Sequence, residues 1–562
     1  MKVSLNWLKE YTDIPMDVDD LAHELTMRGL EVDKIHTIRP GFSGVYVGLV
    51  KDVKKHPHAD KLVVCEVDIG KEVISVVCGA PNVMKDFFVP VALPGAVLGG
   101  SDMEIKPTTI RGVSSQGMIC SEKELGLSQN HEGIMLLENR YPKGANLAMT
   151  DVGHDAIIEF ELTPNRGDCL SILGIAREVS MLTGLPLIKP QIQLKDHHQK
   201  DILSYLSITV DDTTCCPRYT ARIIKNASIS QSPFWLRSKL EKSGIRSINA
   251  LVDITNYVLL ETGQPLHAFD YSLLADTSVI IRKAKHNEKV KSLDGIERTL
   301  SKDMLVIADK EKIIAIAGIM GAENTEIATN SSVIFLESAY FSPSSIRKTG
   351  RELSLGSESS YRFERGVDYD MVSFASDRAA ELIASITGGE IVSGQIDLKN
   401  KHPKKKPITI RHKRVNTVLG TQFSENEILK YLRVLSCTCN LIAKGEWNIH
   451  VPQYRNDLIE EIDLIEEIAR IHGYDVIVPE IPARVKQAYK DSRQKFRKML
   501  GQLRNMLTGL GLTEVLTYSF INNSLLDSFF IDDFVFGKKR VKILNPISQE
   551  YTVMRNSLLP GL

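Results

Sequence analysis

The sequence lacks the features that would mark a membrane, secreted or zinc-binding protein. No apolar run approaches the roughly 18 residues that a membrane-spanning helix needs. The first residues, MKVSLNWLKEYTD, contain no apolar core of signal-peptide length. The eight cysteines are scattered, with no CxxC pair and no Cys/His cluster at zinc spacing. We therefore expect a soluble, cytoplasmic protein with reduced thiols and no membrane contact.

The chain also lacks an excess of charge of either sign. It carries 69 lysines and arginines against 70 aspartates and glutamates, a net charge of −1. A nucleic-acid contact would therefore have to come from local basic patches. With 562 residues, 43% of them hydrophobic, the chain can bury several cores. We expect about three to five domains with an α+β multidomain fold.

The most distinctive stretch runs from Tyr454 to Tyr474, YRNDLIEEIDLIEEIARIHGY. Its apolar residues recur at three- and four-residue spacing, which predicts an amphipathic helix from Leu458 onward. Like charges three and four residues apart share one face of such a helix. A face of this kind is solvated, docks a basic cluster or partner, or holds a hard metal ion through oxygen. The carboxylates in question are Asp463, Glu466 and Glu467, with Glu460 and the preceding Asp457 within reach.

Residues 40–150 consist of short strand patterns divided by glycine, proline and aspartate turns, without a long helix. This arrangement favours a small barrel that is closed or nearly closed. Its loops carry basic side chains that either follow a phosphate backbone or only keep the protein soluble. These side chains are Lys54, Lys55, Lys61 and Arg111.

The first segment, residues 1–39, is too small to bury a core of its own. We expect it to pack against a later strand, turn and helix at Phe160–Leu187, in one domain with residues 151–200. Polar turn residues there, such as Arg166 and Asp168, brace the helix that follows.

After a polar connector at 189–204, residues 205–398 mix helix and strand patterns, which indicates an α+β domain with a cleft. Helices are predicted at Ser232–Ser243 and Ser373–Thr387. Several clusters there can position a water and hold a polar ligand, although His267 taken alone is typical of a core histidine. The candidate residues are Thr255, Asn256, His267, Gly318, Glu337, Ser357 and Ser359.

Several strings together resemble the beta subunit of bacterial phenylalanyl-tRNA synthetases, over essentially the whole chain. HPHADKL and SQGMICS resemble its tRNA-binding barrel of the oligonucleotide-binding class, and QPLHAFD, AGIMG, LESAYFSP and YRFERGVD resemble its editing domain. The resemblance implies that residues 205–398 hydrolyse tyrosine wrongly attached to tRNA(Phe). It places His267, Thr255 and Asn256 in the pocket wall. Glu337 would recognise the tyrosine hydroxyl, while Gly318, Ser357 and Ser359 form the floor.

The same resemblance assigns the remaining segments. Residues 404–480 are similar to a winged-helix-like domain, whose four carboxylates (Asp457, Asp463, Glu466 and Glu467) would bind Mg²⁺ at a site completed by the alpha subunit. Residues 485–562 are similar to the first part of a catalytic-like module, so we expect a C-terminally truncated chain. In that family two alpha and two beta chains assemble, and the alpha chain uses ATP to charge tRNA(Phe).

Two other interpretations stay open. In one, the chain is a non-catalytic tRNA-binding scaffold with an inactive editing pocket. In the other, it is a tRNA-binding protein that acts without an alpha chain. The presence of Glu337 and His267 argues against the first, and the acidic helix, a liability if unpaired, argues against the second.

Overall fold

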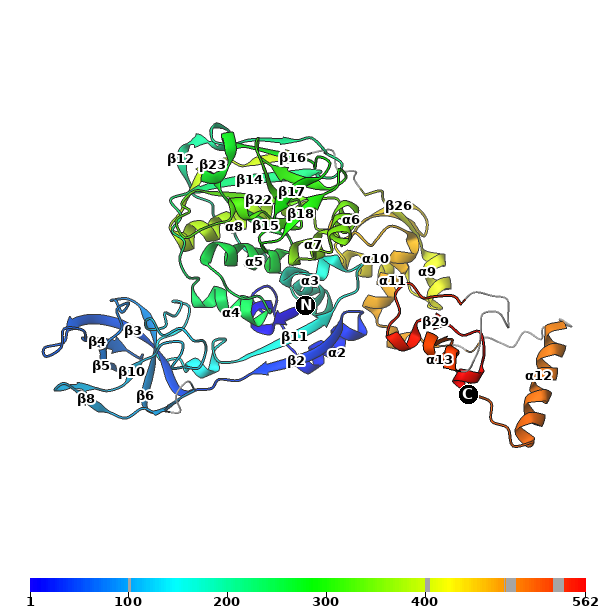
Figure 1. The fold of residues 1–562 in the computed structure, drawn as a ribbon. Helices are drawn as coiled ribbons and strands as arrows, with labels where there is room; N and C mark the ends of the chain where they lie inside the picture. The colour runs from blue at the N-terminus through cyan, green and yellow to red at the C-terminus, as the bar shows by residue number, and fades with distance from the viewer. Residues whose placement is uncertain (100–102, 400–404, 480, 482–491, 529–539) are drawn as a thin grey trace. The chain divides into compact units, whose positions relative to one another are not determined.

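A computed structural model describes residues 1–99, 103–399, 405–479, 481, 492–528 and 540–562 (Figure 1). Contacts divide the chain into two units, Met1–Val478 and Pro479–Leu562. The first unit mixes helices with several sheets, which confirms the mixed α and β class. The predicted boundaries at 404 and 485 lie outside the described residues.

The chain begins with a three-stranded antiparallel sheet whose middle strand comes from much later in the sequence. Its order is β1 (Lys2–Ser4), β11 (Asp155–Glu161) and β2 (Glu31–Ile38). Three helices accompany it, each beginning after a side-chain cap: α1 (Leu5–Leu8), α2 (Val18–Met27) and α3 (Ile172–Thr183). Trp7, Leu21, Phe160 and Val179 meet in one core, so the first segment buries its apolar side chains against the later one.

Residues 43–119 hold a six-stranded sheet with the order β10–β6–β3–β4–β5, in which β7 also pairs with β6. The strands are β3 (Ser43–Lys55), β4 (Val63–Asp68), β5 (Val73–Cys78), β6 (Phe88–Leu98), β7 (Met103–Glu104) and β10 (Met118–Ile119). A separate hairpin consists of β8 (Thr108–Ile110) and β9 (Val113–Ser115). The Gln116 N–H donates to the Ser75 carbonyl at 2.9 Å, which bonds β5 to the segment entering β10. The two ends of the sheet therefore approach each other.

A larger α/β body follows, with two sheets. The first has the order β12 (Asp196–Asp201), β23 (Glu390–Ser393), β14 (Arg218–Lys225), β22 (Ile334–Tyr340) and β15 (Leu266–Asp270), and β24 (Ile396–Lys399) also pairs with β14. The second has the order β13 (Ser207–Val210), β16 (Ser278–Lys283), β19 (Leu305–Ala308), β20 (Ile313–Ile316) and β21 (Met320–Gly321). The prediction of a connector at 189–204 was wrong in part, because β12 joins the first sheet there.

Helices cover one face of the first sheet, and the other face meets the second sheet. Figure 1 shows α5 (Ala250–Thr262) and α8 (Met371–Thr387) side by side beneath β14, β22 and β15. Alternation along β22 assigns Leu336 to the core shared with the helices and Phe335 to the core shared with the second sheet. The remaining elements are α4 (Phe234–Lys242), α6 (Pro343–Leu353), α7 (Glu358–Phe363) and the hairpin β17 (Glu288–Lys291) with β18 (Glu297–Leu300).

The last part of the first unit packs three helices on a three-stranded sheet. The sheet has the order β25 (Ile408–Arg411), β27 (Glu446–His450) and β26 (Thr438–Ala443). The helices are α9 (His412–Leu419), α10 (Glu425–Val434) and α11 (Glu461–His472). The acidic helix α11 begins at Glu461 and not at Leu458 as predicted, because Glu460 is extended (φ −121°, ψ 166°) and caps it.

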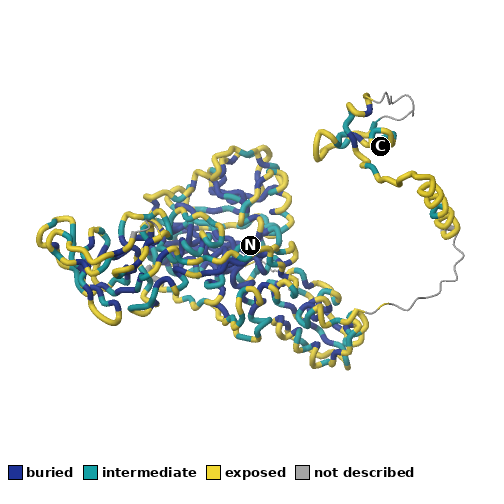
Figure 2. Tube along the Cα trace, turned by 90° about the horizontal axis from the view of Figure 1, so that it is seen from below, coloured by how far each residue is buried: buried dark blue, intermediate teal, exposed yellow. Residues whose placement is uncertain are grey.

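Among its described residues, the second unit has only a small core. It contains α12 (Ser492–Gly509), α13 (Asn523–Ser528) and the pair β28 (Phe520–Ile521) with β29 (Val553–Met554). Ile521, Leu526 and Val553 form its small core. Figure 2 shows α12 exposed over most of its described length. The apolar residues Phe496 and Met499 on this helix are each 58% exposed.

Candidate functional site

The register of two strands brings the predicted acid and histidine together. β15 and β22 are antiparallel, and His267 lies opposite Glu337. Directly opposite residues have side chains on the same face of a sheet. That face looks toward the second sheet, where a cavity of about 50 Å³ opens. Four of the predicted pocket residues line it: His267, Gly318, Glu337 and Ser359.

Two glycines allow the backbone to approach this cavity closely. Gly318 has φ +68°, and a Cβ there would stand 2.8 Å from Ile346 and 2.9 Å from Phe341. A Cβ on Gly321 would stand 2.4 Å from Nε2 of His267. The His267 ring therefore occupies space that only a glycine at 321 leaves open. Gly321 was not singled out from the sequence, although the GIMG string contains it.

The other three predicted pocket residues do not line this cavity. Thr255 is 8% exposed on α5, where its hydroxyl donates to the Val252 carbonyl at 2.8 Å. Asn256 is the next residue of the same helix. Ser357 caps α7 by accepting from the Ser360 N–H at 3.1 Å, and its hydroxyl donates to the Ile319 carbonyl at 2.7 Å. Ser357 thereby anchors the cavity-lining Ile319 to α7.

Burial makes both titratable groups of the cavity neutral near pH 7. Glu337 is 5% exposed, and burial raises its pKa to about 8 against a smaller lowering by Tyr219. Burial lowers the pKa of His267 to about 4. Oε2 of Glu337 is buried without a hydrogen-bond partner among the described residues. A protonated carboxyl of this kind can both donate to and accept from a ligand hydroxyl.

In the acidic segment, two of the four predicted metal ligands are bound by arginine. Arg455 donates to both oxygens of Asp457, at 2.9 and 2.7 Å, and to Oε2 of Glu467 at 2.5 Å. Arg470 donates to both oxygens of Glu467, each at 2.8 Å. Burial alone would raise the pKa of Glu467, but Arg470 and Arg455 hold it far below its usual range. The crowding of like charge is thus relieved by guanidinium groups.

The other two acids lie nearer to solvent. Oδ2 of Asp463 accepts from the N–H groups of Ile459 and Glu460, at 2.8 and 2.7 Å, and so caps α11. Glu466 is exposed. For a magnesium ion, this arrangement leaves oxygens of Asp463 and Glu466 open, whereas those of Asp457 and Glu467 face arginines. The four residues therefore fit an ion only in part, and the magnesium site stays a prediction.

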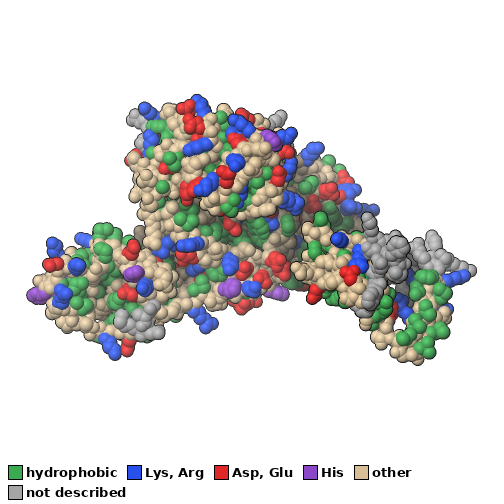
Figure 3. All heavy atoms as spheres, in the orientation of Figure 1, with side chains coloured by type: hydrophobic (Ala, Val, Ile, Leu, Met, Phe, Trp, Pro, Cys, Tyr) green, Lys and Arg blue, Asp and Glu red, His purple; other side chains and the backbone are tan. Residues whose placement is uncertain are grey.

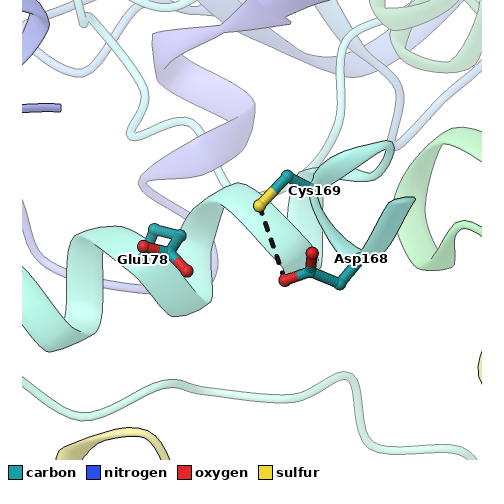
Figure 4. Close-up of side chains that lie close together, drawn as sticks. All are labelled: Asp168, Cys169 and Glu178. Atoms are coloured by element: carbon teal, nitrogen blue, oxygen red, sulfur yellow. Dashed lines mark hydrogen bonds between the residues drawn. The ribbon is translucent and has the colours of Figure 1, made fainter. Parts of the chain in front are cut away.

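A third cluster has the composition of a metal site but already contains a cation. Asp168, Cys169 and Glu178 lie with their ligand atoms within 4.8 Å of one another (Figure 4). Nη2 of Arg166 donates to Asp168 at 3.0 Å, to the Cys169 sulfur at 2.9 Å and to Glu178. The guanidinium thus occupies the position a metal would take, and Arg166 braces α3 as predicted.

This cluster continues into the acidic segment. Arg470 of α11 donates to Oε2 of Glu178 on α3 at 2.6 Å. Arg166, Glu178, Arg470, Glu467 and Arg455 therefore form one buried chain of alternating charge. Glu178 could not be identified from the sequence, because its contact with Arg470 joins residues 292 positions apart. Arg455 and Arg470 were also missed, although they lie two residues before Asp457 and three residues after Glu467, a spacing that favours ion pairs.

The four basic residues singled out in residues 40–150 differ in whether they are already bound by an acid. Lys54 binds Glu66 at 2.8 Å and lies 3.3 Å from Asp52, although it is exposed. Lys55, Lys61 and Arg111 are exposed, and Arg111 has φ +47° in the hairpin turn. On the face seen in Figure 3, basic and acidic side chains are interspersed. Among the described helices, none is both long and apolar enough to cross a membrane.

Family models of tRNA-synthetase components match the chain in four places. They describe a tRNA binding domain (45–146), a B3/4 domain (215–388), a tRNA synthetase B5 domain (408–474) and a phenylalanyl tRNA synthetase beta chain CLM domain (481–562). The fold and these matches define a modular subunit of an aminoacyl-tRNA synthetase, with a tRNA-binding segment.

Relatives that are similar in sequence show which synthetase subunit this chain resembles. The phenylalanine–tRNA ligase beta subunits of Syntrophus aciditrophicus and Geobacter metallireducens are each 43% identical to this chain, over 568 and 563 residues. Each alignment covers 100% of this chain and 70% of the relative. The chain therefore belongs to the family of phenylalanine–tRNA ligase beta subunits, which are ligase subunits of protein biosynthesis. A solved N-terminal fragment of the Pyrococcus horikoshii beta subunit matches with 16% identity and a TM-score of 0.30, over 57% of this chain and 87% of the fragment.

Proposed function

We propose that the cavity between β15 and β21 is a hydrolytic editing pocket for tyrosine esterified to tRNA(Phe). The observation that carries this proposal is the buried Glu337 carboxyl, which lines the cavity opposite a neutral His267. A tyrosine hydroxyl satisfies such a carboxyl. A phenylalanine ring would leave it unpaired, at a cost of roughly 1 to 3 kcal/mol.

The reaction itself is ester hydrolysis. Water attacks the carbonyl carbon, the bond to the ribose oxygen breaks, and that oxygen takes a proton, which yields tyrosine and free tRNA(Phe). The neutral His267 and the backbone held by Gly318 and Ser357 position the aminoacyl end and the water. The cavity of about 50 Å³ holds only one or two water-sized molecules. Lining side chains such as Met320 must therefore move when the ring enters.

The wider function follows from the family. We propose that the chain binds tRNA(Phe) through the barrel loops and assembles with an alpha subunit as two alpha and two beta chains. The alpha subunit would use ATP for aminoacylation. The exposed Glu466 and the partly exposed Asp463 would hold Mg²⁺ at the junction with the alpha subunit, where the ion would neutralise charge. Asp457 and Glu467 would support α11 through their arginines.

A scaffold with an inactive pocket is the second candidate, and the small cavity favours it. Deacylation of tyrosyl-tRNA(Phe) by this chain, alone and with the alpha subunit, separates the two. We expect hydrolysis above the spontaneous rate, lost in Glu337→Ala and His267→Ala.

Gly356→Ala serves as the matched control, because a methyl group there meets no atom within 4 Å. No hydrolysis by a folded chain with the alpha subunit present would overturn the editing proposal and leave the scaffold.

A further inference from the structure

A second buried polar side chain stands beside Glu337 without lining the cavity. Tyr219 lies on β14 and is fully buried. β14 pairs with β22 so that Tyr219 is opposite Ala339 and Ala221 is opposite Glu337. Residues two apart along a strand share a face, so Tyr219 and Glu337 are diagonal neighbours on one face.

Both neighbours carry a polar atom without a well-formed hydrogen bond. The Tyr219 hydroxyl and Oε2 of Glu337 are buried, and neither has a partner of good geometry among the described residues. Buried polar atoms in folded proteins nearly always have partners, so two such exceptions side by side require an explanation. A small rotation of the Glu337 carboxyl would let the phenol O–H donate to Oε2.

The titratable groups around Glu337 are neutral, so the contact with the Tyr219 hydroxyl is what lowers the pKa of this carboxyl. His267, from β15, is neutral because burial lowers its pKa to about 4. The thiol of Cys216 is neutral because burial, and then Glu337 itself, raise its pKa. Burial and then Glu337 also raise the pKa of Tyr219, so the phenol keeps its proton. Among the described residues, Tyr219 therefore acts on this carboxyl as a donor.

We propose that Tyr219 is a positioning residue for Glu337: its hydroxyl holds one carboxyl oxygen, so that the other faces the cavity and recognises a ligand hydroxyl. The identity of that ligand rests on the proposed function, but the contact between the two side chains does not. Without the phenol hydroxyl the carboxyl is free to turn, and recognition of a hydroxyl on the ligand is weakened.

The first test measures the contact without using activity. The free energy of unfolding of the chain is followed from pH 5 to pH 8.5 for the wild type, Tyr219→Phe, Glu337→Gln and the double variant. We expect Tyr219→Phe to raise the pH at which Glu337 titrates, and this effect to vanish in the Glu337→Gln background. Tyr271→Phe is the control, because it removes a different tyrosine hydrogen bond, to the Tyr205 carbonyl at 2.6 Å. An unchanged titration in Tyr219→Phe would overturn the proposal.

The second test measures selectivity in the complex with the alpha subunit. Deacylation of tyrosyl-tRNA(Phe) and phenylalanyl-tRNA(Phe) is compared for the wild type, Tyr219→Phe and Tyr271→Phe. We expect Tyr219→Phe to lower the ratio of kcat/KM for the tyrosyl ester to that for the phenylalanyl ester about tenfold, mainly by raising KM for the tyrosyl ester. Tyr271→Phe should leave this ratio unchanged.

Full preference in a folded Tyr219→Phe variant would overturn the proposed role. If the wild type hydrolyses neither ester, the editing function fails, and the unfolding measurement alone decides whether Tyr219 holds Glu337.

Discussion

Glu337 contributes a stability term that depends on pH. Its pKa in the folded chain is about 8, against 4.5 for an ordinary glutamate. Between these values the unfolded chain has released the proton and the folded chain retains it, so the folded state loses stability as pH rises. At pH 7 the loss is roughly 3 kcal/mol, at 1.36 kcal/mol per pKa unit. His267, with its pKa lowered to about 4, acts in the opposite direction below pH 6.5.

We therefore predict that Glu337→Gln stabilises the chain increasingly from pH 5 to pH 8. The amide cannot ionise, so its difference from the wild type should grow to roughly 3 kcal/mol near neutral pH. The His267 contribution is common to both proteins and cancels in the difference. Urea unfolding at several pH values measures it. A difference that stays constant over this range would mean that Glu337 titrates normally.

At the same cavity we predict that Gly321→Ala abolishes tyrosyl-tRNA deacylation. The added methyl would stand 2.4 Å from Nε2 of His267, so the ring must leave its place. Overpacking of this kind costs about 1 to 3 kcal/mol, and thermal unfolding should show the lower stability. Gly356→Ala, whose methyl group enters open space, should change neither property. Wild-type deacylation by folded Gly321→Ala would show that the ring position does not matter.

At the scale of elements, α3 and α11 are joined by buried charge and not only by apolar contacts. The Arg455 side chain is only 2% exposed. It neutralises Asp457, which precedes α11, and Glu467, which lies within α11. A buried charge that loses its partner is far more costly than the intact pair is stabilising. The chain Arg166, Glu178, Arg470, Glu467 and Arg455 is therefore sensitive to loss of any one member.

We predict that Arg455→Met destabilises the chain by about 3 to 5 kcal/mol, because the buried Glu467 and the partly buried Asp457 then have too few cations beside them. Lys54→Met provides the comparison. It removes exposed pairs with Glu66 and Asp52, which contribute about 0 to 1 kcal/mol. Chemical unfolding of both variants at pH 7 tests the contrast. Equal losses in the two would show that the buried network carries no special weight.

Local patterns predicted most of these elements well. The helices expected at Ser232–Ser243 and Ser373–Thr387 are confirmed as α4 and α8, within two residues at each end. The start of the acidic helix was misplaced because its cap, Glu460, lies within a run that reads as continuous helix. β12 was missed because its sequence, DHHQKD, carries no apolar alternation, and pairing with β23 supplies its structure.

At the scale of the whole molecule, the net charge of −1 supplies no general attraction for tRNA, so exposed basic side chains must bind its phosphates. We predict that Lys55→Ala lowers the slope of log affinity against log salt by about 1, as expected for the loss of one phosphate contact. Lys54→Ala should have a smaller effect, because its ammonium group is already bound by Glu66. Filter binding of tRNA(Phe) between low and moderate salt measures both. Equal slopes for Lys55→Ala and the wild type would remove this loop from the binding surface.

The sequence by itself determined most of the helices and strands and the family to which the chain belongs. These are local properties, set by periodicity, caps and short strings of residues. Only the tertiary structure decided that His267 faces Glu337, that Tyr219 lies beside them, and that Arg470 of α11 binds Glu178 of α3. Strand register and buried ion pairs join residues far apart in the chain. Their geometry depends on how whole elements pack, which no local pattern records.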